Sequence, residues 1–226
     1  MRTLSPAKAI AAWLPERWQA ELKRLHFARQ IRRARFLTNE PEYKILHELV
    51  RPGDWVIDIG ANVGHYTQRL SALVGVHGRV IAFEPVPATF SLLAANAALF
   101  AHPNVSLINA AASDKLDVVG MSMPNFATGL ANYYEAHLVS DSSGPLSVLT
   151  MPVDSLNIEH RIALVKIDAE GHEASVLAGM RTLIKKHRPV LIVETSSAQI
   201  IDDLTAEGYG SVRLPGSPNI LFKPRA

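Results

Sequence analysis

Cysteine is absent from this sequence of 226 residues. Its absence excludes disulfide bonds, thiolate metal ligands and a cysteine nucleophile, and it leaves the redox compartment undetermined because every compartment tolerates such a chain. Long apolar runs are absent too: the longest in the N-terminal region, residues 9–14, is shorter than a signal-peptide core of about 7 to 15 residues. No uncharged run approaches the roughly 20 residues that cross a bilayer. We therefore expect a cytoplasmic protein without a transmembrane segment.

The overall composition is that of a folded globular protein. Hydrophobic residues make up 48% of the chain and charged residues 19%, which excludes a disordered or collagen-like chain. A length of 226 residues suits one domain with a sizeable core.

Basic residues are concentrated at the N-terminus. Residues 1–36 hold nine Lys or Arg and two Glu, a net charge of +7, whereas the other 190 residues carry a net charge of −5. Four apolar residues recur there at helical spacing after a Ser5–Pro6 start signal: Leu14, Trp18, Leu22 and Leu25. The sequence predicts a basic helical arm over residues 1–38, followed by one domain over residues 39–226.

We expect the arm to dock through its apolar stripe and to be separable from any active site. Its basic side chains surround the helix instead of flanking the stripe, so a homo-oligomer or partner contact through residues 1–36 is favoured over peripheral membrane association.

Beyond residue 41, apolar runs of strand type alternate with helical stretches. Predicted strands cover 54–59, 79–84, 105–110, 162–168 and 190–194, helices cover 63–75, 87–101, 173–186 and 198–207, and a hairpin joins 211–214 to 219–222. This alternation predicts an α/β fold with a mostly parallel sheet and helices on both faces. Ligands bind beyond the carboxyl ends of such strands, so functional residues are expected there.

The first strand end carries the run Asp58-Ile-Gly-Ala-Asn-Val-Gly64. The dinucleotide pattern G-x-G-x-x-G, started at Gly60, fails at Asn62 and His65. The S-adenosylmethionine pattern, acid-x-G-x-G-x-G, fails only at Asn62, and Asn tolerates left-handed backbone better than other residues with a side chain. The run therefore favours S-adenosylmethionine, although a purely structural turn remains an alternative.

The second and third strand ends supply further polar groups. Glu84, followed by Pro85, stands 24 residues after Gly60, where an acid accepts hydrogen bonds from ribose hydroxyls. Asn109 and Ala110 end the third strand, where an amide meets an adenine edge and a small residue leaves room for the ring.

The fourth strand end, Lys166-Ile-Asp-Ala-Glu-Gly-His-Glu173, gathers three acids and a histidine. If the chain stays extended, Asp168, Glu170 and His172 project on one face and Glu173 begins the next helix. Crowded carboxylates raise one another's pKa, as a general base requires. We expect no metal, since nothing fixes a complete ligand shell.

These runs, together with Ala82-Phe-Glu-Pro85, Ala112-Ser-Asp114 and Leu191-Ile-Val-Glu194, resemble the FkbM-type family of S-adenosylmethionine-dependent methyltransferases over roughly residues 40–222. In that family Asn commonly replaces the middle glycine. The resemblance implies a Rossmann-like class I methyltransferase fold, in which a seven-stranded, mostly parallel sheet has a reversed last strand. It also implies O-methylation of a sugar, a glycan or a small secondary metabolite.

The residues at the strand ends suggest a division of roles. The cofactor-binding residues would be Asp58, Gly60, Ala61, Asn62, Gly64, Glu84, Pro85, Asn109 and Ala110, and the catalytic residues Asp168, Glu170 and His172. For the base we favour Glu170 or His172, with Asp168 close behind. Asp168 is also placed to hold the cofactor's ammonium group.

The acceptor is expected to be a hydroxyl on a small molecule or glycan. Residues 116–160 contain no Lys or Arg, so the segment over the site is poorly suited to grip nucleic acid phosphates. Phe126, Tyr133 and Tyr134 could stack on a sugar there. The alternatives are a dinucleotide-dependent oxidoreductase, a silent adenosine-binding module, and a nucleic-acid methyltransferase that docks through the arm.

Overall fold

A computed structural model describes residues 15–122, 137–139 and 146–225. The larger sheet comprises β1 (Trp55–Ile59), β2 (Arg79–Phe83), β3 (Val105–Ile108), β8 (Ile162–Ile167), β9 (Val190–Glu194), β10 (Tyr209–Arg213) and β11 (Asn219–Pro224). Its strand order is β10-β11-β9-β8-β1-β2-β3, and β11 alone runs in the opposite direction to the other six strands. The predicted fold class, including the reversed last strand, is confirmed.

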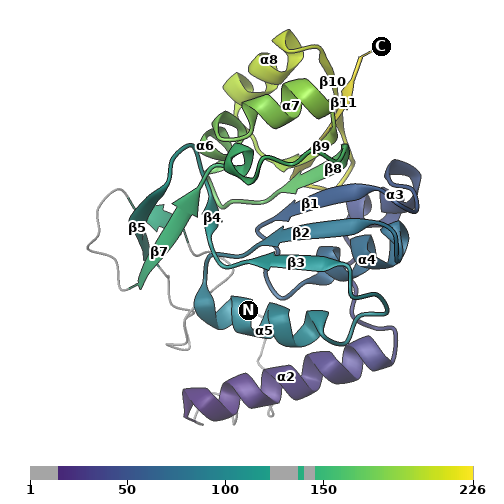
Figure 1. Ribbon diagram of the computed structural model, residues 1–226, viewed down its shortest axis with the longest axis vertical. Coiled ribbons are helices and arrows are strands. Elements are labelled where there is room, and N and C mark those ends of the chain that lie inside the picture. The colour runs from purple at the N-terminus through teal and green to yellow at the C-terminus, as the bar shows by residue number, and fades with distance from the viewer. Residues whose placement is uncertain (1–14, 123–136, 140–145, 226) are drawn as a thin grey trace.

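Both faces of the sheet are covered by helices, which explains the continuous apolar strands (Figure 1). The helices are α3 (Pro41–Leu49), α4 (His65–Val74), α5 (Pro87–Ala97), α6 (Glu173–Ala178), α7 (Arg181–His187) and α8 (Ala198–Ala206). Alternate residues of each strand face opposite sides. Val56 packs with α3 and α4, whereas Ile57 packs with α6, α7 and α8. The predicted helix over 173–186 is two helices, since α6 ends at a cap formed by Gly179. Gly179 lies against the backbone of Ser113, where a Cβ would approach the carbonyl oxygen to 1.8 Å.

A second sheet fills the stretch that the sequence left irregular. It contains β4 (Ala111–Ala112), β5 (Asp117–Ser122), β6 (His137–Val139) and β7 (Leu146–Met151), in the order β4-β7-β5-β6, and η2 (Val153–Leu156), a 3-10 helix, follows it. Val86, Met121 and Val148 form a small core beneath this sheet. Figure 1 shows β5 and β7 projecting beyond one end of the larger sheet. Phe126, Tyr133 and Tyr134 lie outside the described residues.

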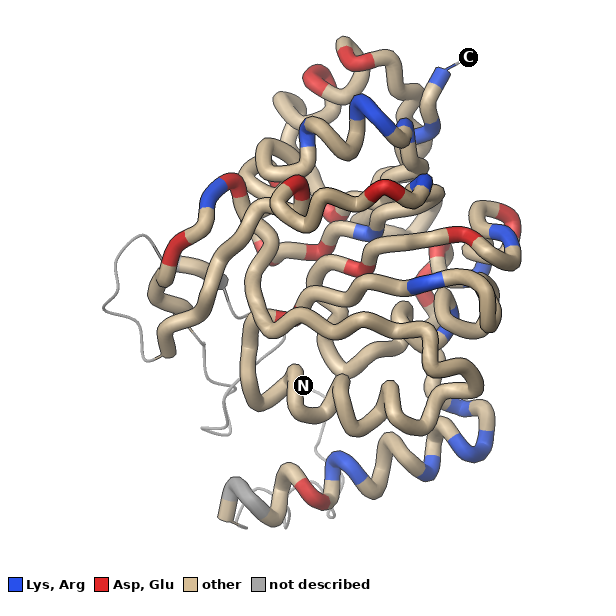
Figure 2. Tube along the Cα trace, in the orientation of Figure 1, with Lys and Arg blue, Asp and Glu red and all other residues tan. Residues whose placement is uncertain are grey.

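The described part of the arm, residues 15–38, contains α2 (Glu16–Arg32), a basic helix beside α5 (Figures 1 and 2). Arg24 donates a hydrogen bond of 2.7 Å from Nη2 to Ser91 Oγ on α5. The apolar residues that face the domain are Phe27 and Ile31. Three residues of the predicted stripe join none of the core clusters of the described residues: Trp18, Leu22 and Leu25 are 55%, 45% and 67% exposed. Ser5 and Leu14 lie outside the described residues.

None of the helices in the described ranges combines the length and the apolar character needed to span a membrane.

Candidate active site

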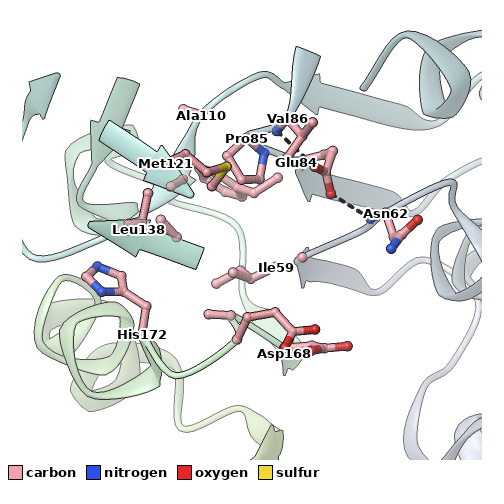
Figure 3. A pocket seen from close by; sticks show the side chains of 16 residues that line it. Ile59, Asn62, Glu84, Pro85, Val86, Ala110, Met121, Leu138, Asp168 and His172 are labelled. Atoms are coloured by element: carbon pink, nitrogen blue, oxygen red, sulfur yellow. Dashed lines mark hydrogen bonds between the residues drawn. The ribbon is translucent and has the colours of Figure 1, made fainter. Parts of the chain in front are cut away.

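A cleft that is partly open to solvent lies at the carboxyl ends of β1, β2 and β8 (Figure 3). Eight of the predicted site residues line it: Gly60, Asn62, Glu84, Pro85, Ala110, Asp168, Glu170 and His172. The structure therefore brings the predicted cofactor half and the predicted catalytic half together in one cavity. Asp58, Ala61, Gly64 and Asn109 are not among the lining residues.

The loop after β1 owes its shape to left-handed backbone. Gly60 has a φ of +76°, and a Cβ there would lie 1.8 Å from the backbone oxygen of Asp168. Asn62 has a φ of +51°, so the residue that departs from the glycine pattern adopts the conformation in which Asn is tolerated best. Its Oδ1 accepts a hydrogen bond of 2.8 Å from the Val63 amide, which closes the turn.

Glu84 is the buried carboxylate of the cofactor half. It is 5% exposed, and its two oxygens accept hydrogen bonds of 2.9 Å from the amides of Asn62 and Val86 (Figure 3). Burial raises the pKa of Glu84 to about 7 against the pull of these two amides. Each carboxylate oxygen has a second lone pair, so the group can still accept two hydroxyl donors from the cleft. The site thus fits the ribose of an adenosyl cofactor.

Two predicted cofactor residues brace the site from outside the cleft. Asp58 is fully buried, and its Oδ2 accepts a hydrogen bond of 2.6 Å from Thr67 Oγ1. Burial raises the pKa of Asp58 even though Lys166 opposes the shift. Asn109 donates from Nδ2 to the carbonyls of Glu84 and Pro85, at 2.8 and 3.0 Å. Its amide N–H groups therefore fix the turn after β2, and its contact with adenine stays a prediction.

The chain does not stay extended after β8, contrary to the sequence-based expectation. It turns at Glu170 and Gly171, which have φ values of +50° and +92°, and Glu173 then begins α6 as predicted. Glu173 Oε1 accepts from the amides of Ala169 and Gly171, at 3.1 and 3.0 Å, which ties the turn to the helix. The turn brings Glu170 and His172 into the cleft beside Asp168.

A buried lysine lies beneath the carboxylates. Lys166 is 3% exposed, and its Nζ lies 2.9 Å from Asp168 Oδ2 and 4.7 Å from the centre of the Tyr66 ring. Burial by itself would lower the pKa of Lys166, but the carboxylates of Asp168 and Asp58 outweigh it and the pKa is raised. Asp168 therefore lines the cleft and is also paired with the buried ammonium group of Lys166.

His172 belongs to a short hydrogen-bond chain. Ser113 Oγ donates to Asp114 Oδ1 at 3.1 Å and lies 2.9 Å from His172 Nε2. A hydroxyl has one proton and a carboxylate only accepts, so His172 donates from Nε2 to Ser113, and Nδ1 is the basic nitrogen. Burial lowers the pKa of His172 although Asp114 and Glu173 oppose the shift, which favours the neutral ring that a base requires.

The sequence did not predict three groups of residues that line the cleft or pack beside it. Met121 and Leu138 of the second sheet line the cleft (Figure 3), and residues 117–122 show no alternating pattern that would have predicted a strand there. Glu194 ends β9 beside the end of β8, because Ile167 pairs with Val193, and the Asp168 carboxyl helps to raise the pKa of Glu194. The arm was expected to be separable, yet Phe36 packs against Val63 of the loop after β1.

Metal ligands do not gather anywhere in the described ranges: no group of three or more His, Asp or Glu side chains there is arranged to hold a metal ion.

The comparisons with known proteins agree with this geometry. A family model described as "Methyltransferase FkbM domain" matches residues 58–209. The hexuronic acid methyltransferase AglP of Haloferax volcanii is 28% identical over 167 residues, which cover 72% of this chain and 65% of that protein. The ribosomal RNA large subunit methyltransferase E of Methanothermobacter thermautotrophicus is 35% identical over 74 residues, 30% of this chain and 35% of its own length.

Among solved structures, the methyltransferase FkbM of Methylobacillus flagellatus has a TM-score of 0.53 and 17% identity, with 90% of this chain and 59% of that chain covered. The chain thus spans less than two thirds of the length of these relatives. The fold, the strand-end residues and the match over most of the domain agree, and the chain belongs to the FkbM methyltransferase domain family.

Proposed function

We propose that this chain uses S-adenosylmethionine to methylate a hydroxyl group on a sugar, a glycan or a small metabolite. The observation that carries the proposal is the cleft itself, in which Glu84 faces the group of Asp168, Glu170 and His172. One side offers a carboxylate suited to ribose hydroxyls, and the other offers acids and a neutral imidazole suited to removing a proton. Family membership supports the methyl donor.

The cofactor, when bound, supplies a methyl group on a positively charged sulfur. The protein's own part is to bind, align and deprotonate the acceptor. Glu84, with Gly60 and Asn62 beside it, would hold the adenosyl portion. Asp168 would face its positive charge. A hydroxyl proton would move to His172 Nδ1 or to the Glu170 carboxylate, and transfer of this kind contributes about 10² to 10⁴ in rate.

The relative AglP suggests a uronic acid as the class of sugar to test first. A uronic acid offers hydroxyl oxygens and a carboxylate, and methylation gives an ether or an ester. The cleft is lined by the carboxyl groups of Glu84, Asp168 and Glu170, and residues 116–160 carry no Lys or Arg. These negative charges repel the carboxylate of a uronic acid from the reacting position, which favours methylation of one of its neutral hydroxyl groups.

Nucleic acid is the second candidate acceptor, because the ribosomal RNA methyltransferase shares 35% identity over 74 residues. The basic helix α2 is the element that would grip phosphates. The charge of residues 116–160 opposes this alternative, since no Lys or Arg occurs in that segment.

The first experiment is calorimetry with S-adenosylmethionine, S-adenosylhomocysteine and NAD. We expect both S-adenosylmethionine and S-adenosylhomocysteine to bind, and Glu84→Ala to weaken the binding of both. Glu48→Gln, a control at an exposed site on α3, should leave both affinities unchanged. Labelled methyl transfer should then be screened over uronic acids, neutral glycosides and RNA, with mild alkali to distinguish ethers from esters. Binding of NAD alone would overturn the proposal, and label found only in RNA would overturn the choice of acceptor.

A further inference from the structure

Asp168 and Glu194 lie side by side at the ends of two neighbouring parallel strands. Ile167 of β8 pairs with Val193 of β9, so the residues that follow them emerge at the same edge of the sheet. Among the charges near Glu194, the Asp168 carboxyl raises the pKa of Glu194 the most. A carboxylate only accepts hydrogen bonds, and two carboxyl groups bonded together therefore need one proton between them.

The surroundings decide which of the two carries the proton. Lys166 Nζ lies 2.9 Å from Asp168 Oδ2, so the negative charge is favoured on Asp168. Glu194 faces Asp168 and Glu170 from the end of β8, with Lys166 behind them. On the other side of Glu194, the register of β11 places Asn219. Asn219 Nδ2 donates a hydrogen bond of 2.6 Å to Glu42 Oε1 on α3. The nearest charges around Glu194 are thus mostly negative.

We propose that Asp168 and Glu194 act as one proton-sharing pair, which releases its proton when the cationic cofactor binds and takes up a proton during methyl transfer. This inference rests on the proposed function. Asp168 lines the cleft and meets the ligand, whereas Glu194 acts through Asp168 and is a positioning residue. Burial and the charges of Asp168 and Glu170 support the proposal, since they raise the pKa of Glu194 to about 7.

The proposal balances the charges of the reaction. The acceptor's O–H bond breaks, its electron pair stays on the oxygen that is methylated, and the proton passes through the base to the pair. The sulfur loses its positive charge in the same turnover, and the pair loses one negative charge. The net charge of the site is therefore the same before and after the reaction, which avoids an uncompensated charge in a partly buried cleft.

A first test needs neither cofactor nor acceptor. In the wild-type protein with ¹³C-labelled glutamate, one side-chain carboxyl resonance should titrate with a midpoint near 7 that Glu194→Gln removes and Glu48→Gln keeps. Glu84 also titrates near 7, so Glu84→Gln assigns the other resonance. A Glu194 resonance that titrates near the ordinary value of 4.5 in the wild-type chain would overturn the proposal without the need for a variant.

The second test compares S-adenosylmethionine, which carries the sulfonium charge, with S-adenosylhomocysteine, which lacks it. From pH 6 to 8 the ratio of their affinities should shift toward the charged cofactor, by up to about tenfold per pH unit below the midpoint. Glu194→Gln should flatten this dependence. If both ligands bind with a constant ratio, the pair is refuted and the proposed function stands. If neither binds, the proposed function fails, while the resonance of Glu194 still reports on the pair.

Discussion

The imidazole of His65 stacks on the ring of Phe36, with centroids 4.1 Å apart and an interplanar angle of 22°. Phe36 lies in the basic arm, four residues after α2 ends, and His65 is the first residue of α4, directly after the loop that begins at Gly60. Phe27 of α2 meets both rings edge-on. The arm and the loop after β1 therefore share one aromatic cluster, and we expect a change in the arm to reach the cleft by direct packing.

Phe36→Ala should destabilise the protein and weaken cofactor binding together. Phe36 is 2% exposed, and removal of a buried Phe side chain costs about 3 to 5 kcal/mol. Urea unfolding and calorimetry with S-adenosylhomocysteine would measure both effects. Trp18→Ala, at a side chain that is 55% exposed, is the matched control and should change neither. Deletion of residues 1–36 should resemble Phe36→Ala, and a truncated chain that keeps full affinity would show that the cluster is dispensable.

Gly60→Ala should be far more damaging than Gly53→Ala. Both glycines have positive φ, +76° and +91°, which costs about 1 to 2 kcal/mol for a residue with a Cβ. Only Gly60 has an obstacle, since a Cβ added there would lie 1.8 Å from the backbone oxygen of Asp168, whereas one added at Gly53 would meet nothing within 4 Å. Denaturant midpoints and cofactor affinity distinguish the two variants, and equal losses would contradict the steric argument.

The free energy of unfolding should fall as pH rises from about 5 to 7. Burial raises the pKa of Glu84 from 4.5 to about 7 in the folded chain, so in this range the folded state binds more protons than the unfolded state. The contribution of Glu84 to the free energy of unfolding is fully present below pH 4.5 and is lost as pH rises through 7. Its upper value is about 3 kcal/mol. Urea titrations at pH 5 and 7.5 measure it. Glu84→Gln should reduce this difference, and an unchanged difference would show that Glu84 titrates normally.

Substitutions of the two favoured bases should have unequal effects on turnover. If His172 is the base, His172→Ala should lower kcat by about 10² to 10⁴ and Glu170→Gln should have a small effect. Ser113→Ala tests the assignment further, since it removes the acceptor of the His172 Nε2–H and leaves Nδ1 in place. Labelled methyl transfer with saturating cofactor is the measurement. Full turnover in both His172→Ala and Glu170→Gln would assign proton removal to Asp168.

Local sequence determined the central sheet and the shape of the cofactor loop. The runs at 54–59, 162–168 and 190–194 are almost continuously apolar, which is typical of strands that are buried on both faces. A parallel sheet covered by helices on both sides provides that burial. The conformation of Asn62 was also readable, because a single residue's backbone preference decides it.

Tertiary structure alone decided which distant groups meet. Asp168 and Glu194 are 26 positions apart, and their contact follows from the order and register of β8 and β9. Phe36 reaches His65 because α2 lies beside α5, and Met121 enters the cleft because the second sheet folds over it. The spacing of apolar residues in the sequence indicates which face of a helix or strand is buried, but it does not indicate which other element that face will contact. The sequence therefore determined the strand ends that line the cleft, and the packing of elements decided which residues meet there.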